Sequence, residues 1–287
     1  MQAEHSTAGT LYIVATPIGN LEDISSRAIR ILREVDCIAC EDTRHTRKLL
    51  THFGIRTPLT SYYREKEGFK AGQLVERLLA GTDIALVSDA GTPGIADPGA
   101  RLVRLARERR IRIVPIPGPS ALSCALSVAG LQDATFFFGG FPPGKKRARQ
   151  AFFNRLAALP CSLVFYEAPH RIAACLRDCL EILGDRQTMV FRELTKIHEE
   201  CIAGPLSAIQ DQVRDKVRGE LVVIIAGSED SRESLPDNLE DLIRWYRDQG
   251  DCSLRDAVHR IAADLNLSRS QVYRQALAVW NEEEPSP

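Results

Sequence analysis

Short runs of apolar, β-branched residues alternate along the first part of the chain with longer segments of helical periodicity. This alternation is typical of βαβ units and predicts a largely parallel sheet. The expected strands lie at 11–15, 36–40, 84–87 and 111–116, and the expected helices lie near 24–34, 44–53, 70–80 and 100–110.

A second α/β pattern follows Pro117-Gly118-Pro119, which cannot continue a strand and indicates a junction. Further strands are expected, with helices between them and a mixed sheet, at 135–138, 162–166, 188–191 and 221–226. We therefore expect two α/β domains and a helical appendage. Their predicted bounds are 1–118, 119–230 and 231–287, the last including a polar linker.

The C-terminal part contains only helical patterns, the first at roughly 238–250. Capping boxes, Ser253 with Asp256 and Ser268 with Gln271, predict two more helix starts, separated by a tight turn at 265–267. The apolar positions expected on the inner faces resemble a helix-turn-helix: Ala257, Ile261, Leu265, Val272 and Leu277. RNA contact through Arg269 and Arg274 and an ordinary helical hairpin are equally compatible with this pattern.

Charge and cysteine usage exclude several functional classes. The formal net charge is −1, so any basic surface must be local. No apolar stretch approaches the roughly 20 residues that span a bilayer, and the N-terminus lacks signal-peptide features, so we expect a cytoplasmic protein without a membrane partner. Cys37 and Cys40 lie in an expected buried strand, and Cys175 and Cys179 share a helix face. We therefore expect no metal site.

Polar and Gly/Pro-rich segments follow six of the expected strands. Because ligands of open α/β sheets bind beyond the carboxyl ends of the strands, this accumulation predicts a site. There is no G-x-G-x-x-G after the first strand, no P-loop and no G-x-S-x-G. Loops poor in side chains suit a compact polar ligand that is not strongly anionic. The segments are 16–20, 41–46, 88–99, 117–121, 166–171 and 192–196.

Seven motifs in this order resemble the S-adenosylmethionine-dependent tetrapyrrole methylase superfamily, and more narrowly its bacterial ribosomal RNA branch. They are TPIGNLED, EDTRHT, LVSDAGTPGIADPG, PIPGPSAL, FYEAPHR, RELTK and GELVVIIAG, and the resemblance runs from about Thr10 to the C-terminus. It implies S-adenosylmethionine as cofactor in a cleft between two α/β domains, and a homodimer. It also implies methyl transfer to the 2′-hydroxyl of a decoding-centre cytidine in small-subunit ribosomal RNA, with the assembled 30S subunit as the expected substrate.

The resemblance carries cofactor-binding roles onto matching positions. SDAGTP replaces the Gly-Asp-Pro of porphyrin-acting relatives, which leaves the match of Asp89 open by a few positions. The expected cofactor residues are Pro17, Asp89, Ala90, Gly91, Thr92, Pro93, Ile95, Ser120, Ala121, Tyr166, Glu167 and Leu221.

A ribose hydroxyl is a weak nucleophile, so a positioned base is expected to assist methyl transfer. Asp42 and Arg44 are the first candidates, because EDTRHT helps distinguish the RNA branch from porphyrin-acting relatives. For any one carboxylate, an ion pair that holds a loop is the stronger alternative. The remaining catalytic candidates are Glu41, Glu167, Glu193 and Lys196.

A basic segment follows the glycine- and proline-rich stretch 139–144, which we expect to be a mobile loop that binds RNA phosphates. Its candidate residues are Lys145, Lys146, Arg147 and Arg149. Two other functions remain open: a porphyrinoid C-methyltransferase with the same cleft, and a non-catalytic RNA-binding protein. The basic segment and helical tail disfavour the first, and the six strand-end segments disfavour the second.

Overall fold

The computed structural model describes residues 8–131, 135–213, 219–228, 238–265 and 267–280. The chain forms two compact units, Met1–Ser228 and Glu229–Pro287. The expected linker falls mainly on 229–237, outside the described residues, as do the termini 1–7 and 281–287.

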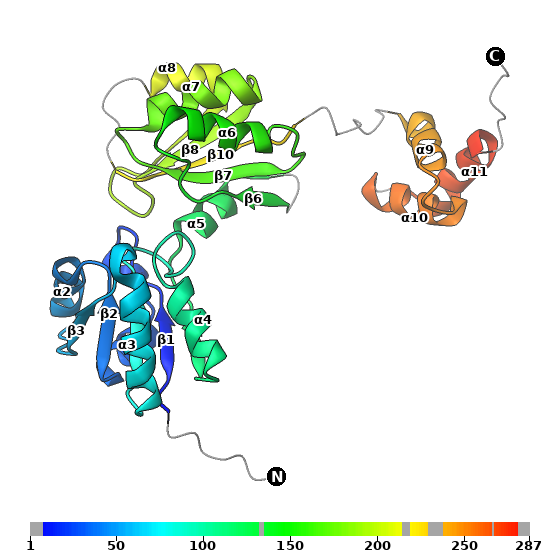
Figure 1. Cartoon of the computed structure of the whole chain (residues 1–287). Helices are drawn as coiled ribbons and strands as arrows, with labels where there is room; N and C mark the ends of the chain where they lie inside the picture. Colours follow the sequence, from blue (N-terminus) through cyan, green and yellow to red (C-terminus); the bar gives the residue numbers. More distant parts are fainter. Residues whose placement is uncertain (1–7, 132–134, 214–218, 229–237, 266, 281–287) are drawn as a thin grey trace, which may run out of the picture. The chain divides into compact units, whose positions relative to one another are not determined.

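The first unit contains two five-stranded sheets (Figure 1). The first sheet has the order β3-β2-β4-β1-β5, and all of its strand pairs are parallel, as predicted. Its strands are β1 (Leu11–Val14), β2 (Cys37–Cys40), β3 (Leu59–Ser61), β4 (Ile84–Val87) and β5 (Ile113–Ile116).

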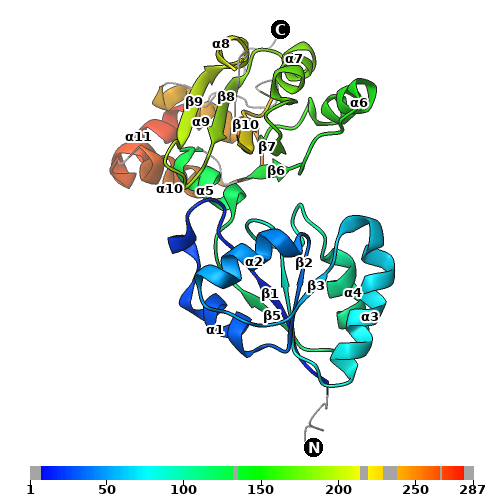
Figure 2. The same ribbon diagram turned by 90° about the vertical axis from the view of Figure 1, so that its left-hand side faces the viewer.

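Helices cover both faces of the first sheet (Figure 2). Ile31 and Leu50 bring two helices onto one face, and Leu74 and Leu102 bring two onto the other. Both faces of the strands are therefore buried, which explains why β2 and β4 read as continuous apolar runs. The helices are α1 (Ser26–Glu34), α2 (Thr43–His52), α3 (Glu67–Leu79) and α4 (Ala100–Glu108).

The second sheet is mixed, with the order β6-β7-β10-β8-β9. Only β6 and β7 pair in parallel, and the other three pairs are antiparallel. Its strands are β6 (Phe136–Phe138), β7 (Ser162–Glu167), β8 (Gln187–Arg192), β9 (Glu200–Pro205) and β10 (Leu221–Ile225).

Three helices pack on one face of the second sheet and α5 (Ala121–Val128) packs on the other (Figure 1). The three are α6 (Lys146–Leu156), α7 (Ile172–Leu183) and α8 (Leu206–Gln212). The sequence pattern missed β3 and β9, which are sheet edges with few buried positions, and α5, which begins directly after the Pro-Gly-Pro junction.

The second unit consists of α9 (Leu239–Asp248), α10 (Leu254–Asp264) and α11 (Arg269–Trp280) around their own small core. The Ser253–Asp256 capping box is present at the start of α10. The Gln271 side chain of the second predicted box lies outside the described residues. Ala257, Ile261 and Val272 are buried as predicted. The prediction was wrong for Leu265 and Leu277, which are exposed, because Ala276 and Val279 face the core instead.

Candidate functional site

A cavity of about 280 Å³ lies within the first unit, where loops that follow strands of both sheets meet. The loops after β1, β2, β4 and β5 approach from the first sheet. The second sheet contributes the loops after β6 and β8, Tyr166 of β7 and the start of β10. The strand-end segments of the sequence thus supply most of its lining. The lining residues are Ile18, Glu41, Asp89, Ala90, Gly91, Thr92, Ile95, Ala96, Asp97, Ser120, Ala121, Phe141, Tyr166, Glu193, Leu194, Lys196, Glu220, Leu221 and Val222.

The loop after β4 is held by its own backbone and by neighbouring loops. Ser88 Oγ donates to the carbonyl oxygen of Ala90 at 3.1 Å, and Thr92 Oγ1 donates to that of Pro119 at 3.1 Å. Gly91 has a φ of +76°, a conformation that glycine adopts without strain. The loop therefore presents backbone to the cavity in a fixed shape.

Two aromatic side chains, Phe141 and Tyr166, also line the cavity. The Tyr166 hydroxyl accepts a hydrogen bond from the backbone N–H of Leu122 at 3.1 Å, which joins β7 to α5. The ring of Phe141 meets that of Tyr166 edge-on, with centroids 5.5 Å apart. Phe141 is 43% exposed, so it contributes an apolar surface at the rim.

The cavity is acidic, because five carboxylates and one lysine line it. Burial raises the pKa of Asp97, and the charges of Glu220 and Asp89 raise it further. Burial also raises the pKa of Glu41, followed by the charges of Asp97 and Asp89. Like charges held together in this way favour a cationic ligand, which would relieve their repulsion.

Only part of the predicted catalytic set lines this cavity: Glu41, Glu193 and Lys196. The amine of Lys196 pairs with Glu193 Oε1 at 2.8 Å, so both side chains also hold the loop after β8. Asp42 instead caps α2, where its side chain accepts from the backbone N–H of Arg44 at 2.7 Å. The hydrogen bonds from the Arg44 side chain and backbone lower the pKa of Asp42, which makes this carboxylate a weaker base.

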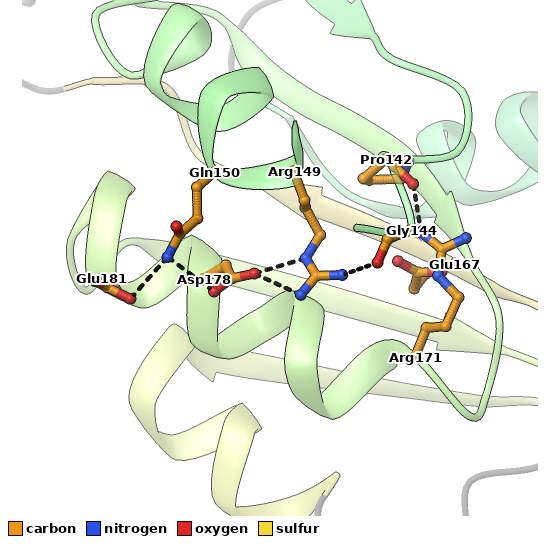
Figure 3. A network of polar contacts seen from close by, with 8 residues as sticks. All are labelled: Pro142, Gly144, Arg149, Gln150, Glu167, Arg171, Asp178 and Glu181. Carbon is orange, nitrogen blue, oxygen red and sulfur yellow. Dashed lines mark hydrogen bonds and ion pairs between the residues drawn. The ribbon is translucent and has the colours of Figure 1, made fainter. Parts of the chain in front are cut away.

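Glu167 is fully buried beneath the site instead of lining the cavity. Its Oε1 accepts from the backbone N–H of Ala168 at 2.8 Å and lies 3.1 Å from Nε of Arg171. Arg171 also donates to the carbonyl oxygen of Pro142 (Figure 3). The structure thus places the Glu167 carboxylate in an internal ion pair and not among the side chains that line the cavity, so its expected role at the ligand stays a prediction.

Most of the predicted cofactor residues line the cavity. They are Asp89, Ala90, Gly91, Thr92, Ile95, Ser120, Ala121, Tyr166 and Leu221. Pro17 lines a neighbouring hollow, and Pro93 is buried within its loop. Sequence analysis missed seven lining residues: Ile18, Ala96, Asp97, Phe141, Leu194, Glu220 and Val222. The sequence could have indicated most of them only by their location, since most lie within or directly beside the strand-end segments.

The predicted RNA-binding role of Arg149 is contradicted by its burial. Arg149 is 5% exposed, and its Nη2 and Nε lie 2.6 and 2.7 Å from Oδ2 of the equally buried Asp178 (Figure 3). Its Nη1 donates to the carbonyl oxygen of Gly144 at 3.2 Å. Together with the Arg171 bond to Pro142, this contact anchors the stretch 139–144, which we had expected to be mobile.

The remaining predicted RNA contacts are all exposed. Lys145, Lys146 and Arg147 stand at the start of α6, and Arg269 and Arg274 stand on α11 in the other unit. Within the described ranges, no group of three or more histidine, cysteine or acidic side chains is arranged to hold a metal ion. None of the described helices combines the length and apolarity needed to cross a bilayer.

The model of the tetrapyrrole (corrin/porphyrin) methylases matches residues 10–210 of the chain. The chain is 53% identical over 229 residues to the "Ribosomal RNA small subunit methyltransferase I" of Xylella fastidiosa strain Temecula1, which covers 78% of this chain and 84% of that protein. It is 42% identical over 281 residues to the protein of the same name from Escherichia coli O157:H7, covering 96% and 97%.

A solved structure shares the fold at low sequence identity. The uroporphyrin-III C-methyltransferase of Thermus thermophilus, complexed with S-adenosylhomocysteine, superposes with a TM-score of 0.55 at 17% identity, covering 75% of this chain and 97% of that one. At this sequence identity the likeness establishes a shared α/β fold and nothing about function.

Proposed function

Because the chain belongs to the tetrapyrrole methylase family, among the proteins named ribosomal RNA small subunit methyltransferase I, we propose that it methylates small-subunit ribosomal RNA. The proposed acceptor is the ribose 2′-hydroxyl of a decoding-centre cytidine, and the proposed methyl donor is S-adenosylmethionine. The observation that carries the proposal is the acidic cavity at the strand ends, lined by five carboxylates and one lysine.

The cavity residues fit S-adenosylmethionine by charge and by shape. The cofactor supplies an activated methyl group on a positively charged sulfur when it is bound. Asp89, Asp97 and Glu220 provide negative charge for such a cation. Burial raises the pKa of Asp97, and the charges of Glu220 and Asp89 add to it, so a bound cation would stabilise its ionised form. The backbone of Ala90, Gly91 and Thr92 allows a ligand to approach without obstruction by large side chains.

Glu41 is the proposed general base for the ribose hydroxyl. It lines the cavity, and among the described residues no cation lies within ion-pair distance of its carboxylate. Its raised pKa brings it closer to neutral pH, where a general base is more effective. Glu193 is less suited, since Lys196 already engages it. Lys145, Lys146 and Arg147 are proposed to bind RNA phosphates, because they are exposed beside the anchored stretch that carries Phe141.

The test is a methyl-transfer assay with isolated small subunits, naked small-subunit RNA and a porphyrinoid as separate acceptors. We expect transfer to the assembled 30S subunit, with the label on the 2′-oxygen of one cytidine when the modified nucleotide is mapped. Transfer to the porphyrinoid alone would establish the alternative C-methyltransferase. S-adenosylmethionine binding without transfer to any acceptor would contradict the proposal.

The location of the protein in the cell and its oligomeric state are also proposed from its family membership. We propose a cytoplasmic homodimer composed of two α/β domains and a helical appendage per subunit, divided near 118 and 230. Sedimentation equilibrium of the full chain tests the oligomeric state, since the 31.8 kDa chain gives twice that mass as a dimer.

A further inference from the structure

Helix α2 carries an exposed basic surface that the proposed site does not use. The helix reads TRHTRKLLTH and contains no acidic residue. Thr46 and Leu50 are buried on the inner side of the helix, which packs over one face of the first sheet (Figure 2). The opposite side of the helix is exposed to solvent. We call its exposed basic side the α2 face; it consists of the cations Arg44, Arg47 and Lys48 together with His52.

The charges of the α2 face oppose one another. Arg44 stands three and four positions before Arg47 and Lys48, so these like charges are neighbours on the helix surface and destabilise it. Arg44 has a partial partner in Asp42, at 3.2 Å. Among the described residues, no carboxylate pairs with Arg47 or Lys48.

Two other helices of the same sheet each pair one surface arginine with a carboxylate on the same helix. In α1, Arg30 pairs with Glu34 at 2.9 Å, and in α4, Arg104 lies 3.9 Å from Glu108. Both pairs have the i, i+4 spacing that stabilises a helix. The α2 face has no such carboxylate, so its charge remains available to an anionic partner.

Neighbouring hollows lie between the α2 face and the candidate cofactor cavity, because each shares a lining residue with the next. A shallow hollow on the face is lined by Thr43, Arg44, Arg47, Lys48, Thr51 and His52. Lys48 also lines a second hollow, together with Pro17, His45 and Asp89. Asp89 in turn lines the cofactor cavity. The α2 face therefore lies next to the region of the cavity.

We propose that the α2 face binds the phosphate backbone of the RNA next to the nucleotide that enters the cavity. The inference rests on the proposed function and adds a binding surface to it. A polyanion fits because the helix presents several cations over about 15 Å, its length at 1.5 Å per residue. The acidic cavity cannot attract phosphates, so the positive charge that holds the RNA must lie outside it.

The test compares the double variant Arg47→Gln/Lys48→Gln with the wild-type chain. Equilibrium binding to isolated small subunits is measured over a series of salt concentrations, and methyl transfer is measured at saturating S-adenosylmethionine. We expect affinity at 0.1 M salt to fall roughly tenfold or more, and the salt dependence to lose about one to two units of slope, because fewer counterions are released. KM for the subunit should rise while kcat stays close to its wild-type value.

The matched control is Arg107→Gln/Arg109→Gln, which removes the same charge from exposed arginines at the far end of α4. The helix α4 begins next to the loop that lines the cavity and runs away from it, so these arginines lie at the end of α4 that is distant from the cavity. The control should leave subunit binding unchanged. An equal loss in both variants would mean that net charge alone acts, and would overturn the inference.

The remaining outcomes separate this inference from the proposed function. If wild-type protein methylates small subunits and the α2 variant binds them with an unchanged salt slope, the α2 face is not an RNA surface although the function stands. Binding to polyglutamate is measured in parallel as a model of an acidic protein. If the α2 variant loses binding to polyglutamate but binds small subunits as the wild type does, the face is a surface for an acidic protein, and the inference is overturned. If wild-type protein binds subunits through the α2 face without methylating them, the proposed function fails and the surface stands.

Discussion

Thr16 and Gly91 form an isolated antiparallel bridge, in which each residue's backbone N–H donates to the other's carbonyl oxygen, at 2.9 and 3.0 Å. The bridge fastens the loop after β1 to the loop after β4, although 75 positions separate the two residues. Gly91 lines the cavity directly beside it. The shape of the candidate cofactor site therefore depends on a long-range backbone contact as well as on local turn residues.

Gly91→Val should weaken S-adenosylmethionine binding by roughly a hundredfold or more, which corresponds to about 2.7 kcal/mol. The substitution places a branched side chain at a cavity-lining position whose φ is +76°, so it both fills the site and strains the loop. Calorimetry provides the measurement. The control is Gly54→Val, at a φ of +64° with open space around it, which should lose stability but keep its affinity. Unchanged affinity in the Gly91 variant would remove this loop from the cofactor site.

Glu41→Gln should lower the turnover of methyl transfer by roughly two to four decades while S-adenosylmethionine still binds, because a general base is lost. Asp42→Asn serves as the comparison, since asparagine also caps helices and the structure gives Asp42 a capping role. It should keep turnover within a few-fold of wild type, and Arg44→Ala should change KM more than kcat. A large loss of turnover in the Asp42 variant with a normal Glu41 variant would restore the assignment made from the sequence.

Asp97→Asn should raise the thermal stability of the ligand-free protein at neutral pH. Burial and the neighbouring carboxylates raise the pKa of Asp97, so the folded state disfavours its ionised form and loses stability as pH rises through that pKa. The gain should vanish below the ordinary aspartate pKa, where the carboxyl is protonated in both states. Asp42→Asn should show the opposite sign at neutral pH, because hydrogen bonds lower the pKa of Asp42. Melting curves at acidic and neutral pH distinguish the two.

Arg149→Ala should destabilise the protein by about 3–5 kcal/mol, since it leaves the buried carboxylate of Asp178 without its partner. Denaturant unfolding measures this cost. The double variant Arg149→Met/Asp178→Leu should recover much of it, because no buried charge is left unpaired. A variant Arg149→Ala of normal stability but poor RNA binding would contradict the structural role of this buried ion pair.

Replacing Lys145, Lys146 and Arg147 by alanine, with Arg149 retained, should weaken small-subunit binding and flatten its salt dependence by up to about one unit of slope per lost phosphate contact. S-adenosylmethionine affinity should not change, because none of the three lines the cavity. The salt titration provides the measurement, and an unaltered slope would show that these side chains are only solvated surface.

The sequence by itself determined the alternation of strands and helices, because apolar periodicity is a local property that each segment carries. It also placed the six strand-end segments, since parallel strands bring their carboxyl ends to one edge, and Ala90, Gly91 and Ser120 accordingly line the cavity. The edge strand β9 was missed because none of its positions is fully buried, so its sequence carries no clear run or alternation of apolar residues.

Only the tertiary structure decided what individual charged residues do. Arg149 and Lys146 belong to one basic run, yet Asp178, 29 positions away, draws Arg149 into the interior and leaves Lys146 in water. Glu41 and Asp42 are adjacent, yet one faces the acidic cavity and the other caps a helix. Burial, ion pairing and the pKa of a carboxylate depend on neighbours that are distant along the chain, and local patterning contains no information about them.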